Sequence, residues 1–226
     1  MSNLGYRVFP HPADAQQDAA LLDQFAQIGV AQISDCMQRL YGVVGLRPFH
    51  QCATRMVGFA VTVKVRPGDN LMIHKAMTMS GAHQIIVVDG HGDTTNALVG
   101  ELMMLDAQRR GIVGFVIDGA IRDSDVFAAQ SSFGCFARDV SHLGPYKDGP
   151  GEVNVPVSVG GQVVQSGDII VGDCDGVVAV PYAQAHEVLA LAQKKEATEQ
   201  VAKQKIAVGT YTKPWLEKTI AERTGA

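Results

Sequence analysis

The sequence has no long hydrophobic run and no segment that resembles an export signal. Its longest apolar stretches, such as IIVVD and GFVID, are far shorter than the ~20 residues that cross a bilayer. The first residues, MSNLGYRVFPHPADAQQ, lack a basic segment followed by an apolar one, as a secretory signal would have. We therefore expect a cytoplasmic protein with no membrane partner.

The chain also lacks a strong excess of either charge. It carries 19 Lys and Arg against 23 Asp and Glu, which gives a net charge of -4. The basic residues are scattered apart from two adjacent pairs, so no positive stripe is available to follow a phosphate backbone. Nucleic acid is not an expected partner.

Short metal-binding and cofactor motifs are missing as well. The four cysteines (Cys36, Cys52, Cys135 and Cys174) are far apart and form no C-x-x-C pair, so we expect reduced thiols without a disulfide framework or a zinc site. None of the seven histidines lies in an H-E-x-x-H motif. The Gly-x-Gly of VVDGHGD lacks the third glycine of a dinucleotide fingerprint, so neither NAD nor a methyl-donor cofactor is supported.

The hydrophobic pattern predicts two helical ends around a middle that is rich in strands. Apolar residues recur at helical spacing over residues 18–40, with Gly29 as a break. Residues 56–65 alternate as a strand does, and QIIVVD is typical of a strand covered on both faces. Residues 100–110 favour a helix that ends on two arginines and Gly111. The segment GFVIDGAIRD follows as a strand.

Later segments add hairpins and a polar helix. VNVPVSV-GG-QVVQ predicts a hairpin, GDIIVGDCDGVVAVP predicts two short strands, and residues 182–206 favour a helix. With 226 residues, we expect one mixed α/β domain with layered sheets. The Gly- and Pro-rich stretch GPYKDGPGEVN, with Lys147 in its middle, is interpreted as a functional loop.

Chemistry-bearing residues follow two of the predicted strands. In an open α/β arrangement, the carboxyl ends of strands and the N-termini of the helices after them share one edge, where ligands bind. Free N–H groups of Glu101, Leu102 and Met103 would form an anion site there, and Gly100 would let the backbone approach a ligand closely. Arg122 ends the next strand and carries a planar fork suited to a carboxylate and an adjacent carbonyl oxygen.

Acidic residues near this arginine suggest a cation. Asp123 is free to hold Mg²⁺ or Mn²⁺, with Glu101 and Asp125 nearby, because such ions are held by one or two carboxylates and several waters. A hard cation and an arginine that face a 2-oxo acid both stabilise the charge developing in an enolate. The chemistry alone leaves a second interpretation, in which these residues form a surface ion-pair network.

The segment GELMMLDAQRRGIVGFVIDGAIRDSD resembles the signature of the 4-hydroxy-4-methyl-2-oxoglutarate / 4-carboxy-4-hydroxy-2-oxoadipate aldolase family, which also contains regulators of ribonuclease E activity. The family pattern is an acidic residue, twenty further residues and then Arg-Asp, and here Glu101 precedes Arg122 and Asp123 with that gap. VVDGHGD, GPYKDGPGEVN and GGQVVQSGDIIVGDCDGVVAVP also resemble family segments, so the likeness covers residues 27–181.

The resemblance implies a three-layer β/β/α swivelling-type fold and a class II aldolase. Backbone groups of Gly100, Glu101, Leu102 and Met103 would bind substrate, and Arg122 would hold the pyruvoyl carboxylate and carbonyl. Asp123 would be the direct metal ligand. The reaction implied is cleavage to pyruvate and a second oxo acid, with oxaloacetate decarboxylation as a side activity. Glu101 stands where the family more often has Asp.

The resemblance also implies assembly and leaves alternatives. Subunits would form a homotrimer or homohexamer, with residues 182–226 as an extension used in oligomer contacts. A carboxylate from a neighbour's C-terminal helix would approach the metal, and Glu196 and Glu199 are both candidates. One rival is a non-catalytic regulator that inhibits ribonuclease E, which would not need Asp123. Another is a related lyase that acts on a different 2-oxo acid.

Overall fold

The structure is a computed structural model that describes residues 4–12, 18–52 and 55–224. Its helices are α1 (Ala19–Phe25), α2 (Val30–Cys36), α3 (Leu71–Thr78), α4 (Glu101–Arg109), α5 (Ser124–Ala128), the 3₁₀ turn η2 (Tyr182–Gln184), α6 (Ala185–Ala207) and α7 (Pro214–Thr224). Its strands are β1 (Gly42–Val43), β2 (Arg47–Pro48), β3 (Met56–Val65), β4 (Gln84–Asp89), β5 (Ala97–Val99), β6 (Gly114–Ile121), β7 (Gly134–Val140), β8 (Gly151–Val153), β9 (Val157–Val159), β10 (Gln162–Val164), β11 (Ile169–Asp173) and β12 (Gly176–Val180).

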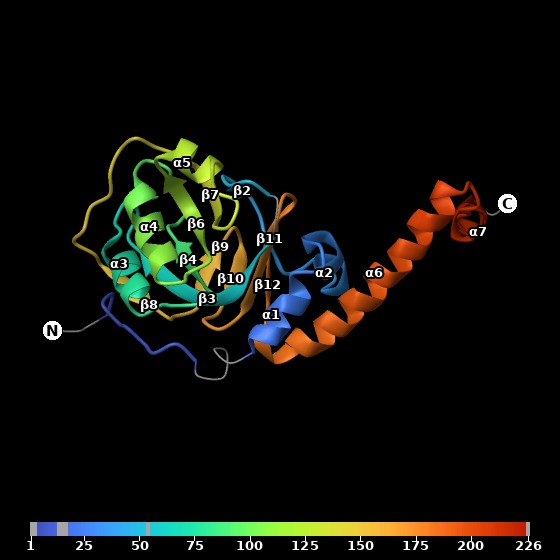
Figure 1. Ribbon diagram of the computed structural model, residues 1–226, viewed down its shortest axis with the longest axis horizontal. Helices are drawn as coiled ribbons and strands as arrows, with labels where there is room; N and C mark the ends of the chain where they lie inside the picture. Colours follow the sequence, from blue (N-terminus) through green and yellow to red (C-terminus); the bar gives the residue numbers. More distant parts are fainter. Residues whose placement is uncertain (1–3, 13–17, 53–54, 225–226) are drawn as a thin grey trace.

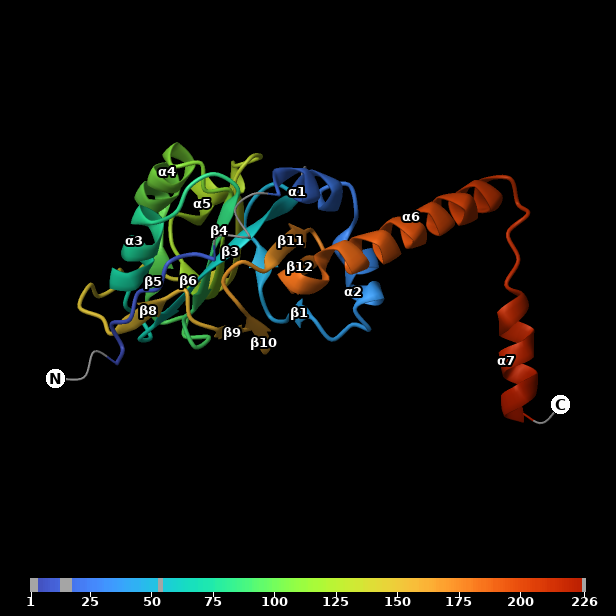
Figure 2. The same cartoon turned by 90° about the horizontal axis from the view of Figure 1, so that it is seen from below.

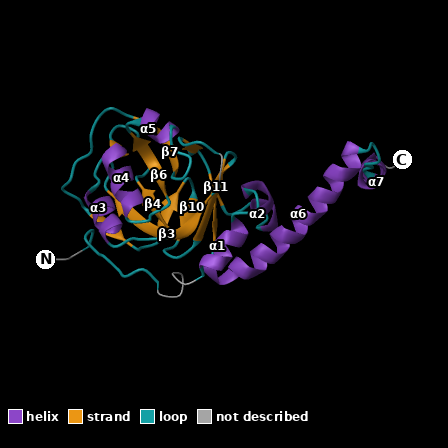
Figure 3. Ribbon diagram, viewed as in Figure 1, coloured by secondary structure: helices purple, strands orange, loops and turns teal. Residues whose placement is uncertain are grey.

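Ten strands form one mixed sheet, in the order β1-β12-β11-β3-β4-β6-β7-β2, with β5 beside β6 and β8 beside β3. Strands β3, β4, β6 and β7 run parallel to one another. Their carboxyl ends therefore lie at the same edge, where Asp89 of β4 is in register with Asp118 of β6. Figures 1 and 3 show this sheet as the centre of the molecule.

Helices cover one face of the sheet. Side chains of α3 and α4 pack on the parallel strands in one apolar cluster that includes Ile73, Met104, Ile117 and Phe127. Helices α1, α2 and α6 pack on β11, β12 and the start of β3 in a second cluster. Because Phe59 and Val61 alternate onto the same side of β3, both groups of helices lie on the same face.

The hairpin β9–β10 covers the other face. Its valines join Ala60, Val87 and Val116 in a third buried cluster. The main sheet curls around this cluster, since a Cβ on Gly172 of β11 would come within 2.6 Å of the Phe136 ring of β7. The order is hairpin, sheet and helices, so the predicted β/β/α layering is confirmed.

Most predicted elements are confirmed. Strand β3 has the predicted bounds, and Gly29 separates α1 from α2 as expected. The hairpin turns at Gly160 and Gly161, which both have positive φ, the backbone region in which glycine is favoured. Helix α3 and strand β7 were not predicted. The four cysteines are free thiols, and burial raises the pKa of Cys52 to about 11.

Both ends of the chain make distinctive contacts. Near the N-terminus, Arg7 pairs with Glu152 (Nε–Oε1 2.5 Å, Nη2–Oε2 2.8 Å), and Val8 forms a parallel bridge with Val153 of β8. At the other end, α6 projects away from the body and α7 turns off its tip (Figures 1 and 2). Within the described ranges, no helix is both long and apolar enough to span a membrane.

Candidate active site

Arg122 and Asp123 lie where the chain leaves β6 and enters α5. The N–H of Arg122 donates to Val99 O at 3.0 Å, which fixes the backbone against the end of β5. Asp123 is the N-cap of α5 and has φ +55° and ψ +43°. Few residues other than glycine adopt this left-handed conformation, and aspartate is among those that tolerate it best. This sharp turn connects the end of β6 directly to α5.

Gly100 begins α4 directly against this turn. Its backbone is extended, with φ −156°, so conformational freedom is not what requires glycine here. A Cβ at this position would lie 2.6 Å from Asp123 Oδ2 and 2.9 Å from Arg122 Cγ. The missing side chain therefore makes the space in which Arg122 and Asp123 approach the start of the helix.

The side chain of Asp123 links the turn after β6 to Arg122 and to the start of α4. Its Oδ2 accepts a hydrogen bond from the N–H of Glu101 at 2.9 Å and lies 3.6 Å from Arg122 Nε. The N–H of Met103 donates to Gly100 O at 3.1 Å. The N-terminus of α4 thus attracts a carboxylate, as its unpaired N–H groups and dipole favour, but in this structure the carboxylate comes from the protein itself.

Arg122 and Asp123 remain accessible, with 45% and 37% of their side-chain surface exposed. Arg122 stands between two hollows. One has a volume of about 260 Å³. Its polar lining residues include Asn70, His74 and Lys147, and the start of α4 contributes Gly100, Leu102 and Met103. The other, of about 630 Å³, is more open and includes Asp123, Ser124, Asp125, Ser141 and His142. A ligand held by Arg122 could extend into either space.

The GPYKDGPGEVN loop forms one wall of the smaller hollow and is held from below by Asp69. This fully buried carboxylate accepts hydrogen bonds from the N–H groups of Asp148 (2.8 Å) and Gly149 (2.9 Å). Beside it, Asn70 Oδ1 lies 3.4 Å from Lys147 Nζ. Lys147, which lies in the loop that the sequence predicted to be functional, therefore lines the hollow that contains Arg122.

Asn70 and His74 are site neighbours that the sequence analysis did not place. Both belong to the unpredicted α3 region, Asn70 as the helix N-cap. Burial lowers the pKa of His74, and the positive charge of Lys147 lowers it further. A neutral imidazole is the favoured form there. Only the tertiary contact between α3 and the loop brings these residues to Arg122.

The acidic residues of the site suit a hard cation only in part. Asp123 Oδ2 is engaged by the N–H of Glu101, while no described residue donates to its Oδ1. Glu101, exposed in the first turn of α4, and Asp125 supply further carboxylates nearby. Within the part of the chain that the structure describes, no three His, Cys, Asp or Glu side chains cluster closely enough to hold a metal. One carboxylate with waters and substrate oxygens is nevertheless an ordinary arrangement for Mg²⁺.

The two C-terminal candidates lie elsewhere in the chain. Glu196 and Glu199 each accept a hydrogen bond from Gln32 Nε2 at 2.7 Å, on the side of α6 that faces α2. In Figure 1, α6 lies at the opposite end of the molecule from α4 and α5. The structure therefore does not bring either glutamate to the Arg122 site of the same chain.

Comparison with known proteins agrees with the fold. A protein of Halalkalibacterium halodurans, provisionally named a 4-hydroxy-4-methyl-2-oxoglutarate aldolase, is 37% identical over 208 residues, which cover 91% of this chain and 98% of that protein. An uncharacterised protein of Pseudomonas syringae pathovar tomato has a similar structure (TM-score 0.76, 29% identity, covering 84% of this chain and 89% of that one). The RNA-processing inhibitor RraA of Thermus thermophilus also superposes (TM-score 0.61, 28% identity, 68% and 92% covered). The model of the RraA-like family, described as aldolase/RraA, matches residues 30–179, and this chain therefore belongs to that family.

Proposed function

We propose that this protein is a divalent-metal-dependent, class II aldolase. It cleaves a 4-hydroxy-2-oxo acid with two or three carboxylates to pyruvate and a second oxo acid. The observation that carries this proposal is the contact of Asp123 Oδ2 with both the Glu101 N–H (2.9 Å) and Arg122 Nε (3.6 Å) around the open space at Gly100. The name of the H. halodurans relative points to the same carbon–carbon lyase chemistry.

Arg122 is the residue that we assign to the substrate. Its guanidinium can donate to a carboxylate oxygen and to the adjacent 2-oxo oxygen together, which fixes the pyruvoyl group in one orientation. Backbone groups of Gly100, Glu101, Leu102 and Met103 would bind the same carboxylate at the helix N-terminus. This binding would displace the Asp123 carboxylate from the Glu101 N–H and free it for a cation.

Asp123 would hold Mg²⁺ or Mn²⁺, with Glu101 acting on a bound water and the substrate supplying other oxygens. Such a cation supplies Lewis-acid stabilisation of an oxyanion. Arg122 contributes from the protein side, because its positive charge faces the 2-oxo oxygen on which negative charge develops as the bond between C3 and C4 breaks. The same enolate forms when oxaloacetate loses carbon dioxide, so we expect that side activity as well.

We further propose that the active protein is a homotrimer or homohexamer. The part of residues 182–226 beyond Ala192 contributes no buried side chain among the described residues, yet it exposes Val201, Ile206, Trp215 and Ile220. Apolar side chains on a projecting helix indicate a partner surface. A neighbouring chain would then receive this extension, with Glu196 or Glu199 as its candidate contribution to the site.

A coupled pyruvate assay on purified protein tests the proposal. The substrates are 4-hydroxy-4-methyl-2-oxoglutarate, 4-carboxy-4-hydroxy-2-oxoadipate and oxaloacetate, each with Mg²⁺ or with a chelator. We expect metal-dependent pyruvate release that falls by about two to three orders of magnitude in Arg122→Ala and in Asp123→Ala, the scale of losing one key stabilising group. His186→Gln, on α6 far from the site, is the matched control and should retain activity. Full activity with chelator or in Asp123→Ala would contradict the metal mechanism.

A regulator is the second candidate, because one structural neighbour is named an RNA-processing inhibitor. Folded protein that releases no pyruvate from any of the three substrates but inhibits ribonuclease E would favour it. Folded protein without either activity would instead favour a related lyase that acts on another 2-oxo acid.

A further inference from the structure

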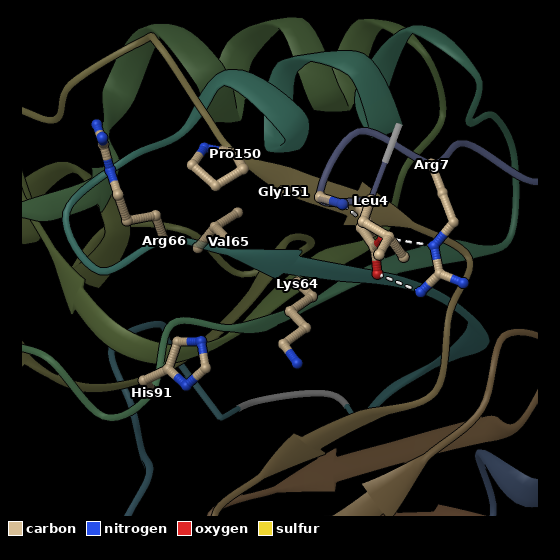
Figure 4. A pocket seen from close by; sticks show the side chains of 10 residues that line it. Leu4, Arg7, Lys64, Val65, Arg66, His91, Pro150 and Gly151 are labelled. Atoms are coloured by element: carbon tan, nitrogen blue, oxygen red, sulfur yellow. Dashed lines mark hydrogen bonds and ion pairs between the residues drawn. The ribbon is translucent and has the colours of Figure 1, made fainter. Parts of the chain in front are cut away.

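A separate hollow of about 450 Å³ opens on the hairpin side of the sheet, beside the end of β3 (Figure 4). Its size lies within the range of small-molecule pockets. Apolar groups from Leu4, Val65 and Pro150 form part of its wall, and Lys64 and His91 bring nitrogen atoms to it. Lys64 belongs to β3 itself, so a regular strand rather than a loop sets the direction of its side chain.

The ammonium of Lys64 forms no close ion pair with the neighbouring strands, although its charge helps to lower the pKa of Glu152. Lys64 is in register with Asp89 on one side and with Glu152 on the other, so two carboxylates are within a strand spacing. Among the described residues, neither forms an ion pair with Lys64 within 4.0 Å. Glu152 is instead bound by Arg7 and by the N–H of Gly5 (3.1 Å). Figure 4 shows the Lys64 side chain reaching toward the part of the hollow where His91 lies.

His91 is held in an uncommon backbone conformation next to that amine. It has φ +59°, and a non-glycine residue in this region stores strain that often marks a functional position. Its N–H donates to Asp89 Oδ1 at 3.1 Å, and its Nδ1 lies 3.8 Å from the same oxygen. Asp89 is buried near the Nδ1 side of the ring, and no described residue forms a hydrogen bond with Nε2, which leaves that nitrogen for another partner.

The charges at the hollow favour an anion, although the whole chain is acidic. Three cations (Arg7, Lys64 and Arg66) line it against one carboxylate (Glu152). Arg7 is paired with Glu152 and Arg66 with Asp69, whereas Lys64 forms no ion pair within 4.0 Å among the described residues. A local positive potential with apolar walls suits an organic anion better than an inorganic one. The walls would contact methylene groups while the amine and imidazole bind the charged end.

We propose that this hollow is a second binding site, which takes a small organic carboxylate through Lys64 and His91. It is distinct from the Arg122 site, because it lies on the face of the sheet covered by the hairpin, whereas α4 and α5 lie on the other. The ammonium of Lys64 forms a charge-assisted hydrogen bond with one carboxylate, and His91 Nε2 donates to the same group.

Isothermal titration calorimetry of the full chain with succinate tests this site, in chelator-treated buffer at constant ionic strength. We expect wild-type protein to bind succinate and Lys64→Gln to bind it about tenfold more weakly, the loss typical of one hydrogen bond to a charged group. His91→Gln should weaken binding in the same direction. Lys203→Gln, an exposed lysine on α6, is the matched control and should bind as the wild type does.

Arg122→Ala separates the two sites, because it should lower pyruvate release by about two to three orders of magnitude yet leave succinate binding unchanged. Loss of succinate binding in Arg122→Ala would assign the ligand to the first site and overturn the proposal. Unchanged binding in both Lys64→Gln and His91→Gln, or no binding by wild-type protein at millimolar succinate, would overturn it too. Inorganic phosphate that binds as tightly as succinate would overturn the ligand class, because the apolar wall would then contribute nothing.

Discussion

The carboxylate of Asp123 is positioned by the backbone N–H of Glu101 and the guanidinium of Arg122, which have twenty residues between them in the sequence. The N–H of Glu101 binds its Oδ2, and Arg122 lies next to it in the chain. Neither contact is possible unless Gly100 leaves its side-chain position empty. At the scale of single residues, the site therefore depends on an absent atom as much as on charged groups.

Gly100→Ala is expected to lower activity sharply while the protein remains folded. The added Cβ would stand 2.6 Å from Asp123 Oδ2 and 3.0 Å from Arg122 Nε, so both functional side chains must move. Displacement of an orienting group by about 1 Å can cost about a hundredfold in rate. Pyruvate release measured alongside circular dichroism would show activity lost with secondary structure retained.

Gly81→Ala is the matched control, because the atom nearest to its added Cβ would be Arg110 O at 3.8 Å, an ordinary contact. This variant should keep wild-type activity. If Gly100→Ala is as active as Gly81→Ala, the space at the start of α4 is not part of the active site.

At the scale of elements, local sequence patterns predicted those segments whose partners are near in the chain or whose periodicity is strong. Strand β3 was predicted from its alternation of apolar residues. Helix α4 was predicted from its helix-forming residues and from the arginines and glycine that end it. The N-terminal segment beside β8 could not be foreseen, since its pairing joins Arg7 to Glu152 across 145 residues. The sequence placed Lys147 in a loop, but it did not identify Asp69 as the residue whose carboxylate holds that loop.

The pairing of Arg7 with Glu152 predicts an acid-sensitive attachment of the N-terminal segment. The side-chain hydrogen bond from Arg7 lowers the pKa of Glu152, and the N–H of Gly5 adds to this effect. A carboxylate with a lowered folded-state pKa stabilises the protein above its ordinary pKa, and that contribution disappears as pH falls through the folded value. The wild type should therefore be more stable than Glu152→Gln at neutral pH, and the difference should vanish in acid.

Urea unfolding of both proteins from neutral pH to about pH 3, well below the ordinary pKa of glutamate, measures this difference. Glu187→Gln, an exposed residue in the first turn of α6, provides the control. A stability gap between wild type and Glu152→Gln that stays constant across the whole range would argue against the ion pair as its source.

At the scale of the whole molecule, the layered α/β arrangement was predictable, because strand alternation and the family likeness agreed with each other. The sequence predicted that the C-terminal extension is helical, but not the direction in which it leaves the body. Helix α6 buries only Ala185, Val188, Leu189 and Ala192, so little of its sequence marks a packed face. The contacts that orient it against α2, such as Gln32 with Glu196 and Glu199, are long-range and leave no local pattern.

Removing residues 210–226 should weaken assembly without unfolding the body. No described residue of α7 is buried, whereas Trp215, Leu216 and Ile220 are exposed and available to a neighbour. Light scattering after size exclusion should give a trimer or hexamer for the full chain and smaller species for the shortened one. A full chain that elutes as a monomer at every concentration would contradict the proposed assembly.

The position of Trp215 also gives the protein a built-in optical reporter. It is the only tryptophan in the chain, and 59% of its surface is exposed on α7, away from the sheet. Emission excited at the red edge of tryptophan absorption would therefore come from Trp215 on α7 alone. It should shift to the blue as chains associate. Unfolding of the body would be followed through Tyr41 and Tyr182, which pack against the second apolar cluster. Assembly and folding would then give separate signals in one sample.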